Sequence, residues 1–176
     1  ESRMVSSADG GRTWGPESQL VAADWAVSAP VREMPDGTYV LGVYWERHGV
    51  AWGGVVRSTD RGATWSEPIA IGKDSGAYLD AETDVILLND GTLLAALRSS
   101  KTVLHVATSP DLGRTWSPVY ATSFPGHCPH LNRLSTGQIL MAIRMPATAL
   151  WVSGDDARTW QGPYEIDTVG GAYPAT

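Results

Sequence analysis

The sequence predicts an all-β fold built from repeated four-stranded antiparallel units. Three observations carry this prediction: a turn motif that occurs four times, a hairpin signal that occurs between its copies, and an unusual composition. The chain holds 19 glycines, 11 prolines and 8 tryptophans, against a single phenylalanine. Abundant turn formers together with bulky β-formers indicate many short strands joined by tight turns.

The turn motif reads Ser-x-Asp-x-Gly-x-Thr-Trp and begins at Ser7, Ser58, Ser109 and Ser153, with Ala157 in place of glycine in the last copy. Serine and aspartate side chains accept hydrogen bonds from backbone N–H groups inside tight turns, and glycine adopts a positive φ without strain. The motif therefore indicates a structural turn and not a catalytic one. Ala157 predicts either a strained backbone or a slightly different turn.

A hairpin signal follows the same period. It reads MPDGTYVLG at 34–42, LNDGTLLAA at 88–96 and LSTGQILMA at 134–142, each with a turn dipeptide between two apolar runs. A third strand leads into each turn motif, and a fourth follows its tryptophan, as at 67–71 and 164–166. Four antiparallel strands, A to D, in a period of roughly 40–50 residues are typical of a β-propeller blade.

The phasing of the two repeats divides the chain. Residues 1–176 are expected to form one partial propeller domain, with strands C and D of one blade at 1–22. Whole blades are expected at 28–72, 80–122 and 127–167, and the start of a further blade at 170–176. Because the pattern begins and stops within a blade, the sequence predicts an internal fragment of a larger propeller.

Charge and composition exclude several classes of protein. The net charge of −6 argues against nucleic acid and anionic membranes as partners. The single cysteine, Cys128, excludes an intrachain disulfide and a cysteine-built metal site. No apolar run is long enough to span a bilayer, and no signal peptide opens the chain, so the compartment stays open. We expect no cofactor.

Strand direction predicts which residues meet. The start of strand A and the end of strand B share one rim, and the turn motifs lie at the opposite rim. Counting from the hairpin glycines, the positions on the first rim are Ser28, Glu82 and Cys128 on strand A, and Tyr44, Arg98 and Arg144 on strand B. Strand A is innermost in a propeller, so these positions should face the central mouth. Two arginines there could converge on one anion, since the guanidinium binds carboxylates in a bidentate manner; alternatively, Glu82 and Arg98 form a plain cross-strand ion pair.

The turn motif resembles the Asp-box, or BNR, repeat of the sialidase (neuraminidase) superfamily, and the resemblance covers essentially the whole chain. It implies a six-bladed propeller in the parent protein. Glu82, in Ala81-Glu82-Thr83-Asp84, matches the glutamate that pairs with the tyrosine nucleophile of these enzymes. Arg98 and Arg144 match the second and third arginines that clamp the substrate carboxylate. Tyr173, after Gly171-Ala172, resembles the nucleophile.

The resemblance implies removal of terminal sialic acid from glycoconjugates with retention of configuration, a tyrosine-based exception among glycosidases. Tyr173 would attack and Glu82 would take the phenol proton, while Arg98 and Arg144 hold the carboxylate. A neutral phenol is not repelled by the carboxylate on the anomeric carbon. The first arginine and the acid/base aspartate of the family normally precede the first Asp box and have no match here. Asp24 is expected to contact substrate and not to act as the acid.

Other candidates lie on the same rim. His127 and His130 flank Cys128, and without a third ligand at a recognisable spacing they indicate substrate contact and no metal site. Tyr44, Trp45 and Trp52 could stack on a sugar or pack between blades. The expected partners are a sialylated glycan or other acidic sugar, and the rest of the propeller or another chain at the open blade edges. The alternative function is a noncatalytic Asp-box propeller that binds glycans or proteins.

Overall fold

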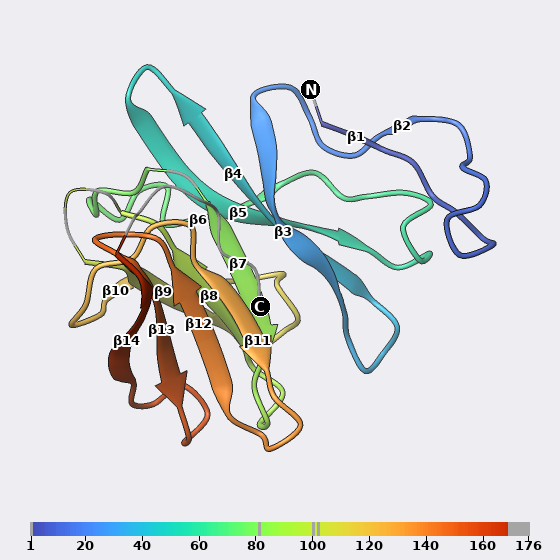
Figure 1. Cartoon of the computed structure of the whole chain (residues 1–176). Helices are drawn as coiled ribbons and strands as arrows, with labels where there is room; N and C mark the ends of the chain where they lie inside the picture. The colour runs from blue at the N-terminus through green and yellow to red at the C-terminus, as the bar shows by residue number, and fades with distance from the viewer. Residues whose placement is uncertain (1, 81, 100, 102, 169–176) are drawn as a thin grey trace.

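A computed structural model of the chain describes residues 2–80, 82–99, 101 and 103–168. Within these residues the regular secondary structure consists of strands, without any helix (Figure 1). Accordingly, the described part of the chain has no helix with the length and apolar character needed to cross a bilayer. The predicted all-β class is confirmed.

Three four-stranded antiparallel sheets follow one another along the chain. The first sheet comprises β3 (Trp25–Glu33), β4 (Tyr39–Arg47), β5 (Val50–Ser58) and β6 (Ile69–Ile71). The second comprises β7 (Thr83–Leu87), β8 (Leu93–Leu97), β9 (His105–Ser109) and β10 (Tyr120–Ala121). The third comprises β11 (His130–Arg133), β12 (Ile139–Ile143), β13 (Thr148–Ser153) and β14 (Gln161–Asp167). At the N-terminal end, β1 (Arg3–Met4) pairs with β2 (Ser18–Gln19).

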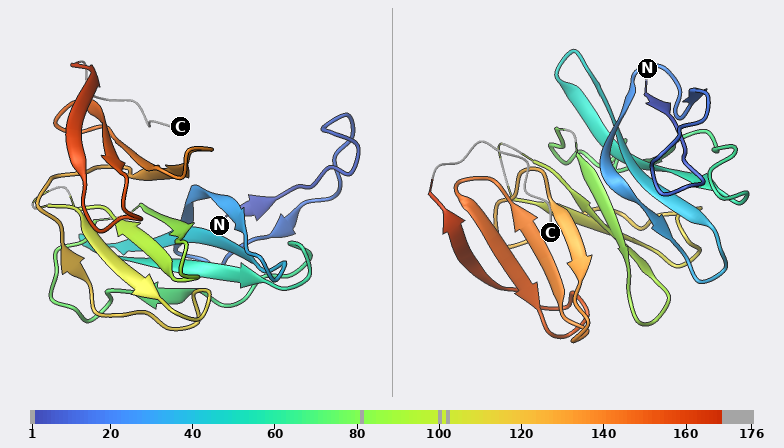
Figure 2. Two further views of the ribbon diagram at one scale, coloured as in Figure 1. Left: turned by 90° about the horizontal axis from the view of Figure 1, so that it is seen from below. Right: turned by 45° about the vertical axis from the view of Figure 1, so that its right-hand side comes forward.

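The sheets are arranged as the blades of a β-propeller. Strands pair in chain order within each sheet, so every sheet is a simple meander. The first strands of the sheets, β3, β7 and β11, lie side by side, with β7 in the middle, and the sheets turn outward from this side (Figure 2). The residues that begin these inner strands are therefore gathered at one end of a common axis.

Apolar side chains fill both spaces between the sheets. Leu93 belongs to the core between the first and second sheets, and its neighbour Leu94 belongs to the core between the second and third. Successive side chains of a strand point to opposite faces, so the second sheet is buried on both faces. This burial explains why the sequence at 93–97 is a continuous apolar run without alternation.

All four Asp boxes have the same hydrogen bonds. The aspartate Oδ1 accepts the threonine N–H at 2.8–2.9 Å, and Oδ2 accepts the threonine hydroxyl at 2.6–2.7 Å. The serine Oγ accepts the N–H of the residue four positions on, at 2.8 Å. These side-chain bonds are common to all four turns, as the sequence motif predicts.

These hydrogen bonds predict how stability depends on pH. Bonds from the threonine hydroxyl and N–H lower the carboxyl pKa of Asp9, Asp60 and Asp155 to about 2, from an ordinary 3.8. A lowered pKa in the folded state contributes stability above the unfolded value and loses it as the pH falls through the folded value. We expect the thermal unfolding midpoint to fall between about pH 4 and about pH 2, and Asp60→Asn to flatten this dependence. An unchanged midpoint over this range would contradict the prediction.

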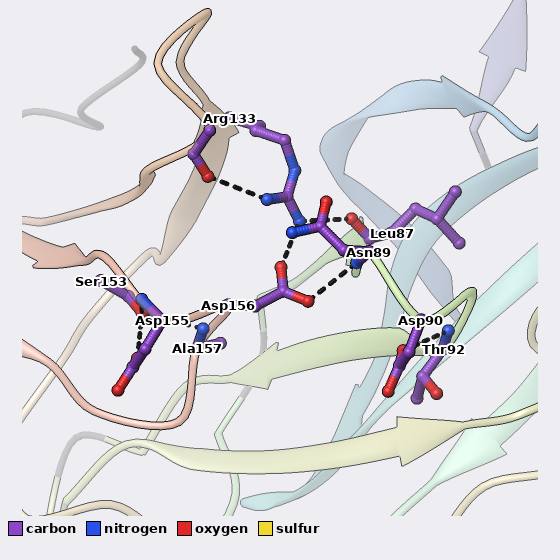
Figure 3. A network of polar contacts seen from close by, with 10 residues as sticks. Leu87, Asn89, Asp90, Thr92, Arg133, Ser153, Asp155, Asp156 and Ala157 are labelled. Atoms are coloured by element: carbon purple, nitrogen blue, oxygen red, sulfur yellow. Dashed lines mark hydrogen bonds and ion pairs between the residues drawn. The ribbon is translucent and has the colours of Figure 1, made fainter.

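Ala157 adopts the backbone conformation of the glycines in the other boxes. Its φ is 67°, against 85–88° for Gly11, Gly62 and Gly113, and its N–H donates to Ser153 Oγ at 2.8 Å. The sequence predicted either a strained backbone or a different turn at Ala157, and the structure has the strained backbone in an unchanged turn. The side chain of the preceding residue, Asp156, accepts hydrogen bonds from Arg133 of β11 at 2.7 Å and from the N–H of Asn89 at 2.8 Å, and the second of these bonds joins the turn to the β7–β8 hairpin of the second sheet (Figure 3).

Ala157→Gly should therefore stabilise the protein. Relief of the left-handed strain, about 1–2 kcal/mol, exceeds the loss of one methyl contact and the extra freedom of the unfolded chain, so we expect a net gain of about 0.5 kcal/mol. Urea unfolding measures the change. Ala63→Gly is the matched control, since Ala63 lies in the second Asp box without a positive φ and its replacement should only destabilise. A less stable Ala157→Gly variant would show that the strain is negligible.

Candidate functional site

Glu82 and Arg98 form a cross-strand ion pair at the end of the second sheet. Arg98 Nη1 donates to Glu82 Oε1 at 2.9 Å and to Oε2 at 2.7 Å. The backbone N–H of Arg98 donates to the Glu82 carbonyl at 3.0 Å, which extends the β7–β8 ladder by one pair. Glu82 is only 3% exposed, and a carboxylate buried to this extent requires such a partner.

The pair lies at the end of the sheet opposite the Asp box. Along the ladder, Thr83 pairs with Leu97 next to the ion pair, whereas Leu93 at the other end pairs with Ser109, the first residue of the third box. The third sheet has the same polarity: Ser153 pairs with Ile139, and Ile143 next to Arg144 pairs with Ala149. The two rims predicted from chain direction are therefore distinct in the second and third sheets.

A second carboxylate, Asp80, contacts the other side of Arg98. Asp80 Oδ1 lies 3.3 Å from Arg98 Nε, and the Asp80 N–H donates to the Arg98 carbonyl at 3.2 Å. Burial lowers the pKa of Arg98, but the hydrogen bonds and negative charges of Glu82 and Asp80 outweigh it, and the pKa is raised overall. Sequence reasoning missed Asp80, which lies before β7, two residues ahead of Glu82 in the sequence.

The third sheet contributes Cys128 and Arg144 to the same region. The Cys128 thiol donates to Glu82 Oε1 at 3.2 Å, and the Arg144 N–H donates to the His127 carbonyl at 3.2 Å. Burial and the charge of Glu82 raise the pKa of Cys128 to about 12, opposed by the positive charges of Arg144 and Arg98. The structure thus places the Cys128 thiol in contact with Glu82, beside Arg98, and Arg144 near enough for its charge to act on the same thiol.

The first sheet departs from the expected register. Tyr44 pairs with Ala26, not with Ser28, because a bulge interrupts β3 between Val27 and Val31. Ser28 instead binds the second sheet: its Oγ accepts the N–H of Thr83 at 3.0 Å and donates to its carbonyl at 3.1 Å. Burial and the charge of Glu82 raise the pKa of Tyr44.

The other predicted contacts lie in different surroundings. Asp24 is half exposed and pairs with Arg47 at 3.4 Å, also half exposed, which is a surface ion pair. His130 begins β11 opposite Ala142. Tyr173 lies outside the described residues. No group of three or more histidine, cysteine, aspartate or glutamate side chains in the described chain could hold a metal ion.

The two tryptophans proposed for sugar stacking lie on each other. Trp45 and Trp52 stack with ring centroids 4.1 Å apart and planes 9° apart, and Trp52 also packs against the core between the first two sheets. The Lys73 ammonium lies 5.3 Å from the Trp52 ring centroid, a cation–π distance. The stacked pair lies within the first sheet, on β4 and β5, and of its two rings Trp52 is the one that packs between blades.

A buried ionic network beside the site ties the three inner strands together. Asp84 Oδ2, on β7, accepts Arg32 Nη2 of β3 at 3.0 Å and the N–H of Leu131 of β11 at 2.7 Å. Arg32 also donates to the carbonyl of Leu131. Burial raises the pKa of Asp84, whereas Arg32 and the backbone N–H groups of Leu131 and Val85 lower it. This network fixes how β7 lies against β3 and β11, and thus where Glu82, two residues earlier, is placed.

Comparison with known proteins connects this arrangement to a family. Residues 1–175 match the BNR repeat-like domain. A sialidase of Micromonospora viridifaciens is 29% identical over 202 aligned positions, which cover 92% of this chain and 31% of the relative. A Dyadobacter fermentans protein of unknown function superposes with a TM-score of 0.72 at 18% identity, covering 96% of this chain and 50% of that one. A NanB sialidase of Streptococcus pneumoniae superposes with a TM-score of 0.73 at 19% identity, and the match covers 98% of this chain and 30% of the NanB chain.

These similarities differ in what they establish. The structural ones, at such low identity, show the fold and support the predicted propeller. The curated sialidase is matched over about a third of its length, 31%. The family model, in contrast, matches residues 1–175 of the 176. The chain therefore belongs to the BNR repeat-like domain family, among proteins that include sialidases.

Proposed function

We propose that this chain carries part of the active site of a retaining exo-sialidase that removes terminal sialic acid from glycoconjugates. The observation that supports the proposal most is the convergence of Glu82 and Arg98 with the third sheet, where Cys128 contacts Glu82 and the charge of Arg144 acts on the same thiol. Two arginines and a buried carboxylate at one rim suit an anionic sugar that carries both a carboxylate and a reacting anomeric carbon.

Each residue has a distinct part in the proposed reaction. Arg98 and Arg144 hold the substrate carboxylate and so orient the sugar ring toward the nucleophile. Glu82 accepts the phenol proton of Tyr173 while the phenol oxygen attacks the anomeric carbon. The aglycone leaves with a proton donated by a general acid. Water then releases the sugar from tyrosine, and two inversions give net retention.

Asp80 fits this division of roles. With Glu82 and Asp80 on two sides of Arg98, the guanidinium is held at 18% side-chain exposure by two carboxylates before substrate arrives. A pre-oriented arginine loses less conformational entropy on binding than a freely rotating one. The same two negative charges weaken the attraction of Arg98 for an anion.

The test is hydrolysis of a fluorogenic sialoside by the full-length protein, with NMR of the first-formed anomer. We expect turnover with retention, and little or no turnover by the 176-residue chain alone, which lacks matches for the acid/base aspartate and the first arginine. Arg144→Met should raise KM more than it lowers kcat. Binding of sialylated glycans by the full-length protein without hydrolysis would instead favour a noncatalytic glycan-binding propeller.

A further inference from the structure

Ser28 of the first sheet bonds the backbone of the second sheet beside Glu82. Its Oγ accepts the Thr83 N–H at 3.0 Å and donates to the Thr83 carbonyl at 3.1 Å. Ser28 lies where the pairing of β3 with β4 is interrupted, between Val27 and Val31. Bulges of this kind re-aim side chains, and here the hydroxyl bonds a strand of another sheet, 55 residues further along the chain.

The peptide group between Glu82 and Thr83 is held from both sides. Its carbonyl, which belongs to Glu82, accepts the backbone N–H of Arg98 at 3.0 Å. Its N–H, which belongs to Thr83, donates to Ser28 Oγ. The C=O and N–H of a trans peptide group lie in one plane and point in opposite directions. The two bonds therefore fix the orientation of a plane that begins at the Cα of Glu82.

Two glycines allow the first sheet to approach Thr83. A Cβ at Gly42 of β4 would overlap the Thr83 carbonyl oxygen, and a Cβ at Gly53 of β5 would overlap Thr83 Oγ1. Thr83 is completely buried, so without the Ser28 hydroxyl its N–H would lack this acceptor in a place shielded from solvent. Because a buried donor without an acceptor is unfavourable, the peptide group would then turn toward another partner.

We propose that Ser28 is a positioning residue that fixes the peptide group between Glu82 and Thr83, and thereby the place of the Glu82 side chain at the rim. This inference rests on the proposed function, in which Glu82 is the base. A base must lie within hydrogen-bond reach of the proton that it removes, and small misplacements lower the rate strongly. The first sheet thus contributes to the proposed reaction through a backbone contact.

Substitutions in the full-length protein test this role. Ser28→Ala removes the hydroxyl, and we expect kcat to fall about 10-fold with KM changed less than about 2-fold. Ser28→Cys keeps the shape with a weaker hydrogen-bonding group and should lower kcat about 3-fold, whereas Ser28→Thr keeps a hydroxyl and should retain kcat within about 3-fold of wild type. Circular dichroism and thermal unfolding establish which variants fold.

Ser117→Ala is the matched control. The Ser117 hydroxyl also accepts one backbone N–H, from Thr108 at 3.0 Å, and donates to one carbonyl, of Pro118 at 2.8 Å. It follows the third Asp box, at the rim opposite Glu82, so its loss should leave kcat unchanged. If the folded Ser28→Ala and Ser28→Cys variants lower kcat no more than Ser117→Ala does, the proposal is overturned.

Hydrogen exchange tests the contact without using activity. In Ser28→Ala the Thr83 N–H loses the hydroxyl as its acceptor. The backbone N–H of Arg98, whose acceptor belongs to the same peptide group, should then exchange about 10-fold faster than in wild type. Unchanged exchange at Arg98 overturns the positioning of Glu82 by Ser28, even if the protein hydrolyses sialosides. Faster exchange at Arg98 in a protein without hydrolytic activity overturns the proposed function, and leaves Ser28 as a residue that only orders this peptide group.

Discussion

Replacing Tyr173 with phenylalanine in the full-length protein is expected to lower kcat for sialoside hydrolysis by about 10³-fold or more. The substitution removes one oxygen, and that oxygen is the proposed nucleophile, so the covalent route is lost. KM should change little, since in the proposed site Arg98 and Arg144 would hold the substrate carboxylate independently of the phenol. Initial rates with a fluorogenic sialoside over a range of concentrations separate the two parameters.

Two further tyrosines make this experiment specific. Tyr164, on β14, is 53% exposed, and Tyr164→Phe should leave kcat unchanged. Burial and the charge of Glu82 raise the pKa of Tyr44, and this electrostatic link to Glu82 makes Tyr44 the alternative candidate for the role. If Tyr44→Phe abolishes hydrolysis and Tyr173→Phe does not, the nucleophile is Tyr44 and the match of Tyr173 to the family motif is wrong.

The repeats made the fold predictable from sequence because they encode turns. In each Asp box the turn is closed by the side chains of the motif itself, as for Ser109 with Asp111 and Thr115. A local hydrogen-bond pattern of this kind leaves a local sequence signature. The same holds for Glu82 and Arg98, since their spacing from the hairpin glycine Gly91 fixes their pairing once the turn is known.

What the sequence did not reveal depends on contacts between sheets. The bonds from Cys128 to Glu82 and from Arg32 to Asp84 join residues 46 and 52 positions apart, respectively. Such contacts depend on how far one sheet is turned against the next, which no turn motif specifies. The bulge in β3 is a second case: it shifts Tyr44 to pair with Ala26, and an extra residue pair in a strand leaves only a weak sequence signal. For Asp80 the available signal was an acidic side chain two positions before Glu82 in the sequence.

Removing the Asp84 carboxylate should produce the largest loss of stability among the residues discussed. Asp84 is fully buried, and a single oxygen of its carboxylate, Oδ2, accepts hydrogen bonds both from Arg32 and from the Leu131 N–H. Asp84→Ala would leave a guanidinium with 20% side-chain exposure and a buried N–H without this acceptor. Breaking one partner of a buried ion pair typically costs about 3–5 kcal/mol, and we expect a loss of that size in urea unfolding.

The matched control is the surface pair of Asp24 with Arg47, whose side chains are 50% and 58% exposed. Asp24→Ala should cost at most about 1 kcal/mol, because water screens exposed ion pairs. Asp84→Asn keeps the shape of the side chain and one carbonyl acceptor, so its loss of stability should lie between those of Asp24→Ala and Asp84→Ala. If Asp84→Ala costs no more than Asp24→Ala, the three inner strands are held by apolar packing alone. In that case the position of Glu82 relative to the third sheet depends on the cores between the sheets, and not on the ionic network beside it.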